Sequence, residues 1–274
     1  MGGASCGRGN IVSENNKVRL EFEHDGQVAR IWLAAPKANI IDQAMMARLE
    51  RAFAELAERR DLKAIVLAGE GAHFSFGASV QEHLPESIAA TLARLHALLR
   101  RIAEAPAPTI AAVHGQCLGG GLEVALACDL ILAEDDARLG CPEIQLGVFP
   151  PAASAILPVR IGAGPAAELV LSGANITGMV AAEIGLVNRT AASGELENAL
   201  AEWLAAEFLP RSAAALRLAA QATRRPLLRA LRYELPVLEC IYLEELMREP
   251  DALEGIRAFM EKRRPNWRRS GVTA

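Results

Sequence analysis

The chain has 274 residues, of which 51% are hydrophobic, 23% charged and only 4% aromatic. Its formal net charge of −4 argues against a dedicated nucleic-acid-binding protein. The length suits one sizeable domain, the alanine- and leucine-rich composition favours a helix-rich fold, and no apolar run is long enough to cross a bilayer.

The extreme N-terminus and the cysteines indicate a cytoplasmic protein. Residues 1–12 lack the apolar centre of a signal peptide, and we expect a disordered lead-in there. The five cysteines are odd in number and show no paired spacing, which favours free thiols in a reducing cytoplasm. No cluster of His, Cys and Asp has the spacing of metal ligands, so we expect no metal.

The first elements predicted along the chain are two strands and a helix. Residues 18–23 and 28–33 are β-branched or alternating, and Asp25-Gly26 between them predicts a hairpin. Residues 43–60 carry apolar side chains at helical spacing, and Asp42 stands where it can cap that helix.

The middle of the chain alternates buried strands with helices. Residues 63–69 form a short, fully apolar strand of the kind that is buried on both faces. A helical stretch at 87–105 leads to a strand at 109–115, and a further strand follows at 129–134. Alternation of this kind predicts an α/β sheet with right-handed crossovers and with ligands at the carboxyl ends of its strands.

The chain is mostly helical from Pro165 onward. Helices are predicted at 196–208, 213–223, 227–247 and 252–262. The change from a mixed to a helical pattern falls near residue 200, and no internal repeat or low-complexity linker interrupts the chain. We therefore expect a core over residues 13–200 and a helical region over residues 201–274.

Three consecutive glycines, Gly119 to Gly121, lie where the strand at 109–115 gives way to a helix. Glycine lets a ligand approach the main chain closely, and the first amides of a helix have no partner inside it, so they can stabilise negative charge. Glu123 lies one turn further on, which suggests acid–base chemistry beside a stabilised oxyanion. Tight packing of the helix on the sheet explains the same residues. Neither the P-loop pattern nor GxGxxG is present.

A second glutamate, Glu143, follows Cys141-Pro142 after the next strand. The strand and loop between Glu123 and Glu143 are long enough to bring both carboxylates to one end of the sheet. Paired carboxylates can divide the roles of acid and base or hold one water between them, whereas solvated charges at loop ends are the alternative. His73 and His114 lie near the same turns, without a carboxylate or serine partner at local spacing.

Taken together, the motifs at 74–79, 114–123 and 141–147 resemble the crotonase (enoyl-CoA hydratase/isomerase) superfamily. The resemblance extends over nearly the whole chain. It implies an α/β fold, in which residues 13–200 form a spiral of ββα units. It also implies that the helical residues 201–274 build a homo-oligomer, either a trimer or a dimer of trimers.

The resemblance further implies a site for an acyl-CoA thioester. Glu123 and Glu143 match the two carboxylates of the hydratases, and the amides of Ala78 and Gly120 match the oxyanion hole. No separate cofactor is expected, because coenzyme A is carried as part of the substrate. The other residues expected to contact the thioester are Lys37, Ala38, Asn39, Ile40, Ser79, Val80 and Gln81, with Phe259 and Lys262 from a neighbouring subunit.

Within the superfamily, the segments 74–85, 147–154 and 242–247 are most similar to the dienoyl-CoA hydratases of anaerobic benzoyl-CoA degradation. Ser79 stands where hydratases of linear substrates usually have aspartate, and residues 149–154 replace a glycine-rich turn, which implies a reshaped acyl pocket. One alternative is a hydratase or isomerase of linear enoyl-CoA. The other is an RNA-binding protein, for which the basic candidates outside the C-terminal tail are Arg224, Arg225, Arg229 and Arg232. Neither a nucleic-acid nor a membrane partner is expected.

Overall fold

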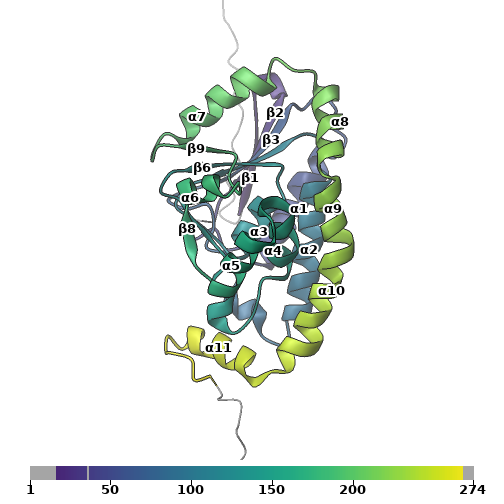
Figure 1. Ribbon diagram of the computed structural model, residues 1–274. Helices are drawn as coiled ribbons and strands as arrows, with labels where there is room; N and C mark the ends of the chain where they lie inside the picture. The colour runs from purple at the N-terminus through teal and green to yellow at the C-terminus, as the bar shows by residue number, and fades with distance from the viewer. Residues whose placement is uncertain (1–16, 36, 268–274) are drawn as a thin grey trace, which may run out of the picture.

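The computed structural model describes residues 17–35 and 37–267. The lead-in expected at residues 1–12 lies outside this part of the chain. Figure 1 shows a twisted sheet with helices on both of its faces and a column of C-terminal helices along one side. Within the described ranges, no helix combines the length and the apolar character needed to span a membrane.

The main sheet has six strands in the order β1-β2-β3-β4-β6-β9. The first two strands pair antiparallel as the predicted hairpin, and every later neighbour is parallel. All six residues of β3 are buried, because helices cover both faces of the sheet at its centre. The strands are β1 (Val18–Glu23), β2 (Val28–Leu33), β3 (Ala64–Gly69), β4 (Thr109–Val113), β6 (Leu130–Glu134) and β9 (Arg189–Ala191).

Each face of the main sheet contributes to a different apolar core. Helices α1 (Gln43–Leu56) and α2 (Ile88–Ala103) pack on the face that carries Ile31 and Leu67. Helix α7 (Leu196–Trp203) and the π-helical turn after it pack on the opposite face. Helix α1 begins where the sequence predicts, because the Asp42 carboxylate accepts a hydrogen bond from the Met45 amide at 2.8 Å.

A second, three-stranded sheet was not predicted. It consists of β5 (Gln116–Leu118), β7 (Arg138–Gly140) and β8 (Asn175–Thr177), in that order. Three residues are too few to show an alternating pattern, so these strands are visible only through their pairing. Strand β5 leads directly into α3 (Gly120–Leu126), and the small sheet therefore fixes where that helix starts.

The remaining helices include the helices that the sequence predicts in the C-terminal part of the chain and the helix α4, which it does not predict. The column in Figure 1 runs from α8 through α9 to α10, with π-helical turns at 230–234 and 241–245, and α11 crosses its end. The helices are α4 (Pro151–Ile161), α5 (Ala163–Ser172), α6 (Gly178–Glu183), α8 (Ala213–Thr223), α9 (Arg225–Arg229), α10 (Leu235–Cys240) and α11 (Pro250–Met260). Short 3-10 helices occupy His24–Gly26, Val80–His83, Pro142–Leu146 and Leu246–Arg248.

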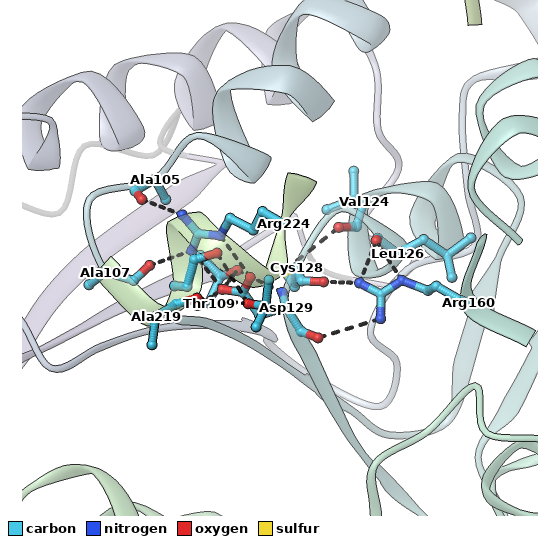
Figure 2. Close-up of polar contacts among 12 residues, drawn as sticks. Ala105, Ala107, Thr109, Val124, Leu126, Cys128, Asp129, Arg160, Ala219 and Arg224 are labelled. Atoms are coloured by element: carbon cyan, nitrogen blue, oxygen red, sulfur yellow. Dashed lines mark hydrogen bonds and ion pairs between the residues drawn. The ribbon is translucent and has the colours of Figure 1, made fainter. Parts of the chain in front are cut away.

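Arg224, at the junction of α8 and α9, anchors this column to the main sheet (Figure 2). Its guanidinium donates to both carboxylate oxygens of Asp129, at 2.7 and 2.6 Å, and to the carbonyls of Ala105 and Ala107. Asp129 also accepts from the amide and hydroxyl of Thr109 at the start of β4. The buried arginine is thus paired and fully hydrogen-bonded, as a charge in the interior must be.

Candidate active site

The two glutamates reach the same region from different elements. Glu123 lies in the first turn of α3, and Glu143 lies in the 3-10 helix at Pro142–Leu146, directly after β7. The amide of Gly119 donates to the carbonyl of Gly140 at 2.9 Å, which joins the residue before α3 to the end of β7. This backbone bond brings both carboxylate-bearing segments to one end of the small sheet.

Glu123 is buried and is held by the first turn of α4. Its Oε1 accepts a hydrogen bond from the Ala153 amide at 2.9 Å, and the Ala152 amide also stabilises the carboxylate. Residues 149–154 are predicted from the sequence as a stiff turn, whereas the chain is helical from Pro151, after Pro150 as N-cap. Proline suits the first position of a helix because its missing N–H would have no partner there. The helix N-terminus therefore provides the amides that bind Glu123.

The opposite ends of α3 and α4 are also tied together. Arg160, near the end of α4, donates to the carbonyls of Leu126 and Cys128 at the end of α3 (Figure 2). The bonds from its Nε and Nη2 to Leu126 measure 3.0 and 2.7 Å. The Ala153 amide therefore binds the first turn of α3 and Arg160 binds its last carbonyls, so α4 holds α3 at both ends.

The pKa values of the two carboxyl groups are both raised. Burial raises the pKa of Glu123 to about 7, against the opposing effect of the Ala153 and Ala152 amides. Burial and the charge of Glu123 raise the pKa of Glu143 to about 8. Glu143 Oε2 is buried and has no hydrogen-bond partner among the described residues. Near neutral pH the pair can therefore hold one proton, which provides one acid and one base.

The amides of Ala78 and Gly120 lie beside each other. A Cβ placed on Gly120 would stand 3.1 Å from the Ala78 amide nitrogen, tighter than most real contacts of a Cβ, so glycine suits this close approach. Gly120 is the first residue of α3, where an amide has no acceptor in its own helix. Ser75 Oγ accepts from the Gly77 amide and donates to the Asn39 carbonyl, which orders the turn before Ala78. Two such amides can bind an oxygen that gains negative charge.

A cavity of about 320 Å³ opens beside these groups. Of the residues expected from the sequence, its lining includes Ala78, Val80, Glu143 and Phe259. The lining does not include Glu123, Gly120 or seven residues expected to contact the thioester. Those seven are Lys37, Ala38, Asn39, Ile40, Ser79, Gln81 and Lys262.

Phe259 lines the cavity of its own chain, whereas the family resemblance implies that it comes from a neighbouring subunit. Helix α11 folds back against the 3-10 helix that carries Glu143, and Gly255 makes this possible. A Cβ on Gly255 would lie 2.0 Å from the Leu146 carbonyl oxygen. Gly255 and Leu146 are more than a hundred residues apart in the chain. No local sequence pattern therefore predicts their contact.

Two polar residues near the cavity were missed. His83 lines it, and its Nδ1–H donates to the Ser79 carbonyl at 2.8 Å, while burial lowers the pKa of the imidazole. Arg263 also lines it and is paired with Glu254 and Glu261. A histidine in a short 3-10 helix has no periodic pattern around it, so the sequence offered only its position near Ala78 as a signal.

The histidines that the sequence did single out make local contacts. His73 Nδ1 accepts from the Gln116 amide at 3.2 Å, and its ring packs edge-on against Phe76. His114 Nε2 lies 2.8 Å from the Gly71 carbonyl. Both residues order the turns beside β5, and neither lines the cavity.

Comparison with known proteins gives matches over nearly the whole chain. Residues 23–270 match the family described as enoyl-CoA hydratase/isomerase. A cyclohexa-1,5-dienecarbonyl-CoA hydratase of Thauera aromatica is 45% identical over 92% of this chain and 97% of that protein. A probable enoyl-CoA hydratase of Bacillus subtilis is 35% identical over 89% of this chain and 96% of that protein. The crystal structure of an enoyl-CoA hydratase from Mycobacterium avium subsp. paratuberculosis superposes with a TM-score of 0.81 at 25% identity, covering 92% of this chain and 99% of that one.

Proposed function

This chain belongs to the enoyl-CoA hydratase/isomerase family and is an enoyl-CoA hydratase, a hydro-lyase, and we propose that its substrate is cyclohexa-1,5-diene-1-carbonyl-CoA. The observation that carries this choice of acyl group is the 45% identity with the Thauera aromatica protein. The product is 6-hydroxycyclohex-1-ene-1-carbonyl-CoA, and the reaction serves the anaerobic degradation of benzoyl-CoA.

The reaction starts with attack of water on the β-carbon of the ring. Electrons move onto the thioester oxygen, which lies between the amides of Ala78 and Gly120. Loss of one such donor typically raises the barrier by about 3 kcal/mol. The second ring double bond is conjugated with the enolate, so the charge extends to the γ-carbon. Protonation at that carbon completes a net 1,4-addition of water.

The surroundings of the two glutamates divide their roles. Glu123 is stabilised as an anion by the amides at the start of α4, so it takes the proton of the attacking water. Glu143 has the more strongly raised pKa, so it holds the proton that passes to the ring. Exchange of a proton from Glu123 to Glu143 restores the pair for the next turnover.

Coenzyme A extends from the cavity along the residues that the family resemblance assigns to it. Val80 and Phe259 line the cavity beside Ala78, which supports their contact with the thioester arm. Lys262, next to Arg263, provides a cation for the phosphates, since Arg263 is engaged by Glu254 and Glu261.

We further propose that residues 201–274 mediate assembly into a homotrimer or a dimer of trimers. The helical column exposes several large apolar side chains, which a monomer would leave in water. These side chains are Leu218, Val237 and Ile241. The free buried thiols of Cys117, Cys128 and Cys141 fit the reducing cytoplasm that we propose as its location.

The second candidate function is hydration of linear enoyl-CoA, which the 35% identity with the Bacillus subtilis protein favours. The RNA-binding alternative loses part of its basis, because Arg224 is buried and bonded to Asp129 rather than exposed on a basic face. Arg232 also lies 3.9 Å from the Glu104 carboxylate.

A parallel assay separates the two hydratase candidates. The purified protein is given cyclohexa-1,5-diene-1-carbonyl-CoA and crotonyl-CoA, and the gain of one water is followed by mass spectrometry. We expect rapid hydration of the cyclic diene and slow hydration of crotonyl-CoA. The reverse preference would overturn the proposed substrate and leave the hydratase assignment in place.

A further inference from the structure

Tyr242 has a buried hydroxyl group without a partner. Its side chain is 1% exposed, in the π-helical turn that follows α10, and no described residue accepts from or donates to its hydroxyl. Leaving a buried hydroxyl unpaired costs free energy, so native structures rarely tolerate it without a reason. A ligand with a polar atom at this position would remove that cost.

The ring of Tyr242 packs against the segment that follows Glu143. Tyr242 and Val148 belong to one buried apolar cluster, and the Phe149 ring meets the tyrosine ring nearly edge-on at 5.5 Å between centroids. The Val148 amide in turn donates to the Glu143 carbonyl at 3.3 Å. A short path of contacts therefore links the tyrosine ring to the backbone of Glu143.

The electrostatics agree with this placement. Burial raises the pKa of Tyr242, and the charges of Glu143 and Glu123 raise it further. The charges of both carboxylates therefore reach this side chain, and the raised pKa keeps its hydroxyl protonated at neutral pH. It can donate one hydrogen bond and accept others.

A water molecule would satisfy both the Tyr242 hydroxyl and the Glu143 carboxyl group. Glu143 Oε2 is also buried and unpaired, and a buried water typically makes about three hydrogen bonds to such groups. The hydrocarbon end of an enoyl group offers no polar atom, whereas the added water does. We propose that the Tyr242 hydroxyl, together with Glu143, hydrogen-bonds the water that is added and then the new hydroxyl group of the product. This inference rests on the proposed roles of Glu123 and Glu143.

The proposal predicts a difference between two kinds of ligand. Tyr242→Phe removes only the hydroxyl, and the chain's other tyrosine, Tyr233, is 63% exposed and provides the matched control Tyr233→Phe. Competitive inhibition constants are measured for the hydroxylated product and for cyclohexanecarbonyl-CoA, which carries no hydroxyl and cannot be hydrated. In Tyr242→Phe we expect the constant for the product to rise about tenfold, the loss of one hydrogen bond, and that for the saturated ester to change less than about twofold.

Turnover provides the second readout. We expect kcat of Tyr242→Phe to fall by about 10- to 100-fold, with little change in KM, and Tyr233→Phe to match the wild type. An equal rise in both inhibition constants would mean that the tyrosine only shapes the pocket, and unchanged constants would mean that its hydroxyl touches nothing in the complex. Either result would overturn the proposal.

The experiment keeps this inference separate from the proposed substrate. If the wild-type protein hydrates crotonyl-CoA rather than the cyclic diene, the same comparison is made with 3-hydroxybutyryl-CoA and butyryl-CoA. A selective loss for the hydroxylated ester would then support the role of Tyr242 while the cyclic substrate is abandoned.

Discussion

Gly119 and Glu143 approach each other so closely that a Cβ on Gly119 would lie 2.5 Å from Glu143 Oε1. Gly119 also has a φ of 49° and a ψ of −126°, a backbone conformation that other residues rarely adopt. The glycine before α3 therefore makes room for the second glutamate of the site, in addition to letting the chain turn.

Substitution Gly119→Ala should displace the Glu143 carboxylate. We expect kcat for hydration to fall at least about 100-fold, because a shift of about 1 Å in a reacting group has an effect of that size. The matched control is Gly164→Ala in α5, where an added Cβ meets nothing within 4 Å. Steady-state kinetics of the two variants test the idea, and it would fail if both behaved like the wild type.

Substitution Glu143→Gln should leave binding of the CoA ester largely intact while hydration is lost. The amide has the same shape as the carboxyl group and cannot donate its proton to the ring. We expect kcat to fall about 100- to 10,000-fold, measured by mass spectrometry of the esters, with the saturated ester binding as in the wild type. Near-normal turnover in this variant would refute the assigned role.

The pH dependence of kcat should be bell-shaped. Hydration needs Glu123 ionised and Glu143 protonated, and their pKa values lie at about 7 and about 8. The rate should rise as pH approaches 7 and decline above 8. In Glu143→Gln any residual rate should lack the decline on the alkaline side. The test is to measure kcat between pH 5 and 10 for the wild type and for Glu143→Gln. A rate that rises steadily up to pH 10 in the wild type would contradict the role of Glu143 as the acid.

The raised pKa of Glu143 also predicts how stability changes with pH. The folded state keeps this proton up to about pH 8, whereas the unfolded chain releases it near the ordinary value of 4.5. Between these values the folded state binds more protons, so the free energy of unfolding falls as pH rises. Glu143→Gln does not titrate. Its melting temperature should exceed that of the wild type at pH 8.5, and the difference should disappear at pH 4; an equal difference at both pH values would contradict the shift.

Breaking the buried pair of Asp129 and Arg224 in Figure 2 should destabilise the folded state far more than breaking an exposed pair. Asp129→Asn leaves the Arg224 charge buried and unpaired, which should lower the free energy of unfolding by about 3–5 kcal/mol. Asp61→Asn removes the exposed partner of Arg59 and should change it by less than about 1 kcal/mol. Urea denaturation of both variants makes the comparison. Similar midpoints would show that the hydrogen bonds between Arg224 and Asp129 do not stabilise the docking of the C-terminal helices on the main sheet.

The sequence predicted five of the six strands of the main sheet because these strands carry local signals, and it missed the three-residue strand β9. Residues 64–69 are apolar throughout, and Asp42 caps α1 as expected. Strands β5, β7 and β8 have three residues each, so their pairing rather than their composition defines them. The two prolines at 150 and 151 read as a turn, although a helix can begin with proline.

The site was predictable to the extent that its residues lie in short motifs. Ala78, Gly120, Glu123 and Glu143 each follow or form a recognisable turn, and the structure brings these turns together. Tyr242 lies far along the chain in a helical segment, where an aromatic residue indicates only an apolar face. Its position beside the segment that follows Glu143 depends on how the C-terminal helices fold back, and no local pattern encodes that.

Helix α3 carries the Gly120 amide, which we propose as an oxyanion donor, and the Glu123 carboxylate, which we propose as the proton acceptor, and it is held at both ends by α4. The group that stabilises the oxyanion and the group that takes the proton therefore move as one rigid unit. Phe149 and Tyr242, which we propose to lie near the acyl group, belong to other segments and can be exchanged without altering the spacing within that unit. Such a division allows a new acyl group to be accommodated while the chemical step is inherited unchanged.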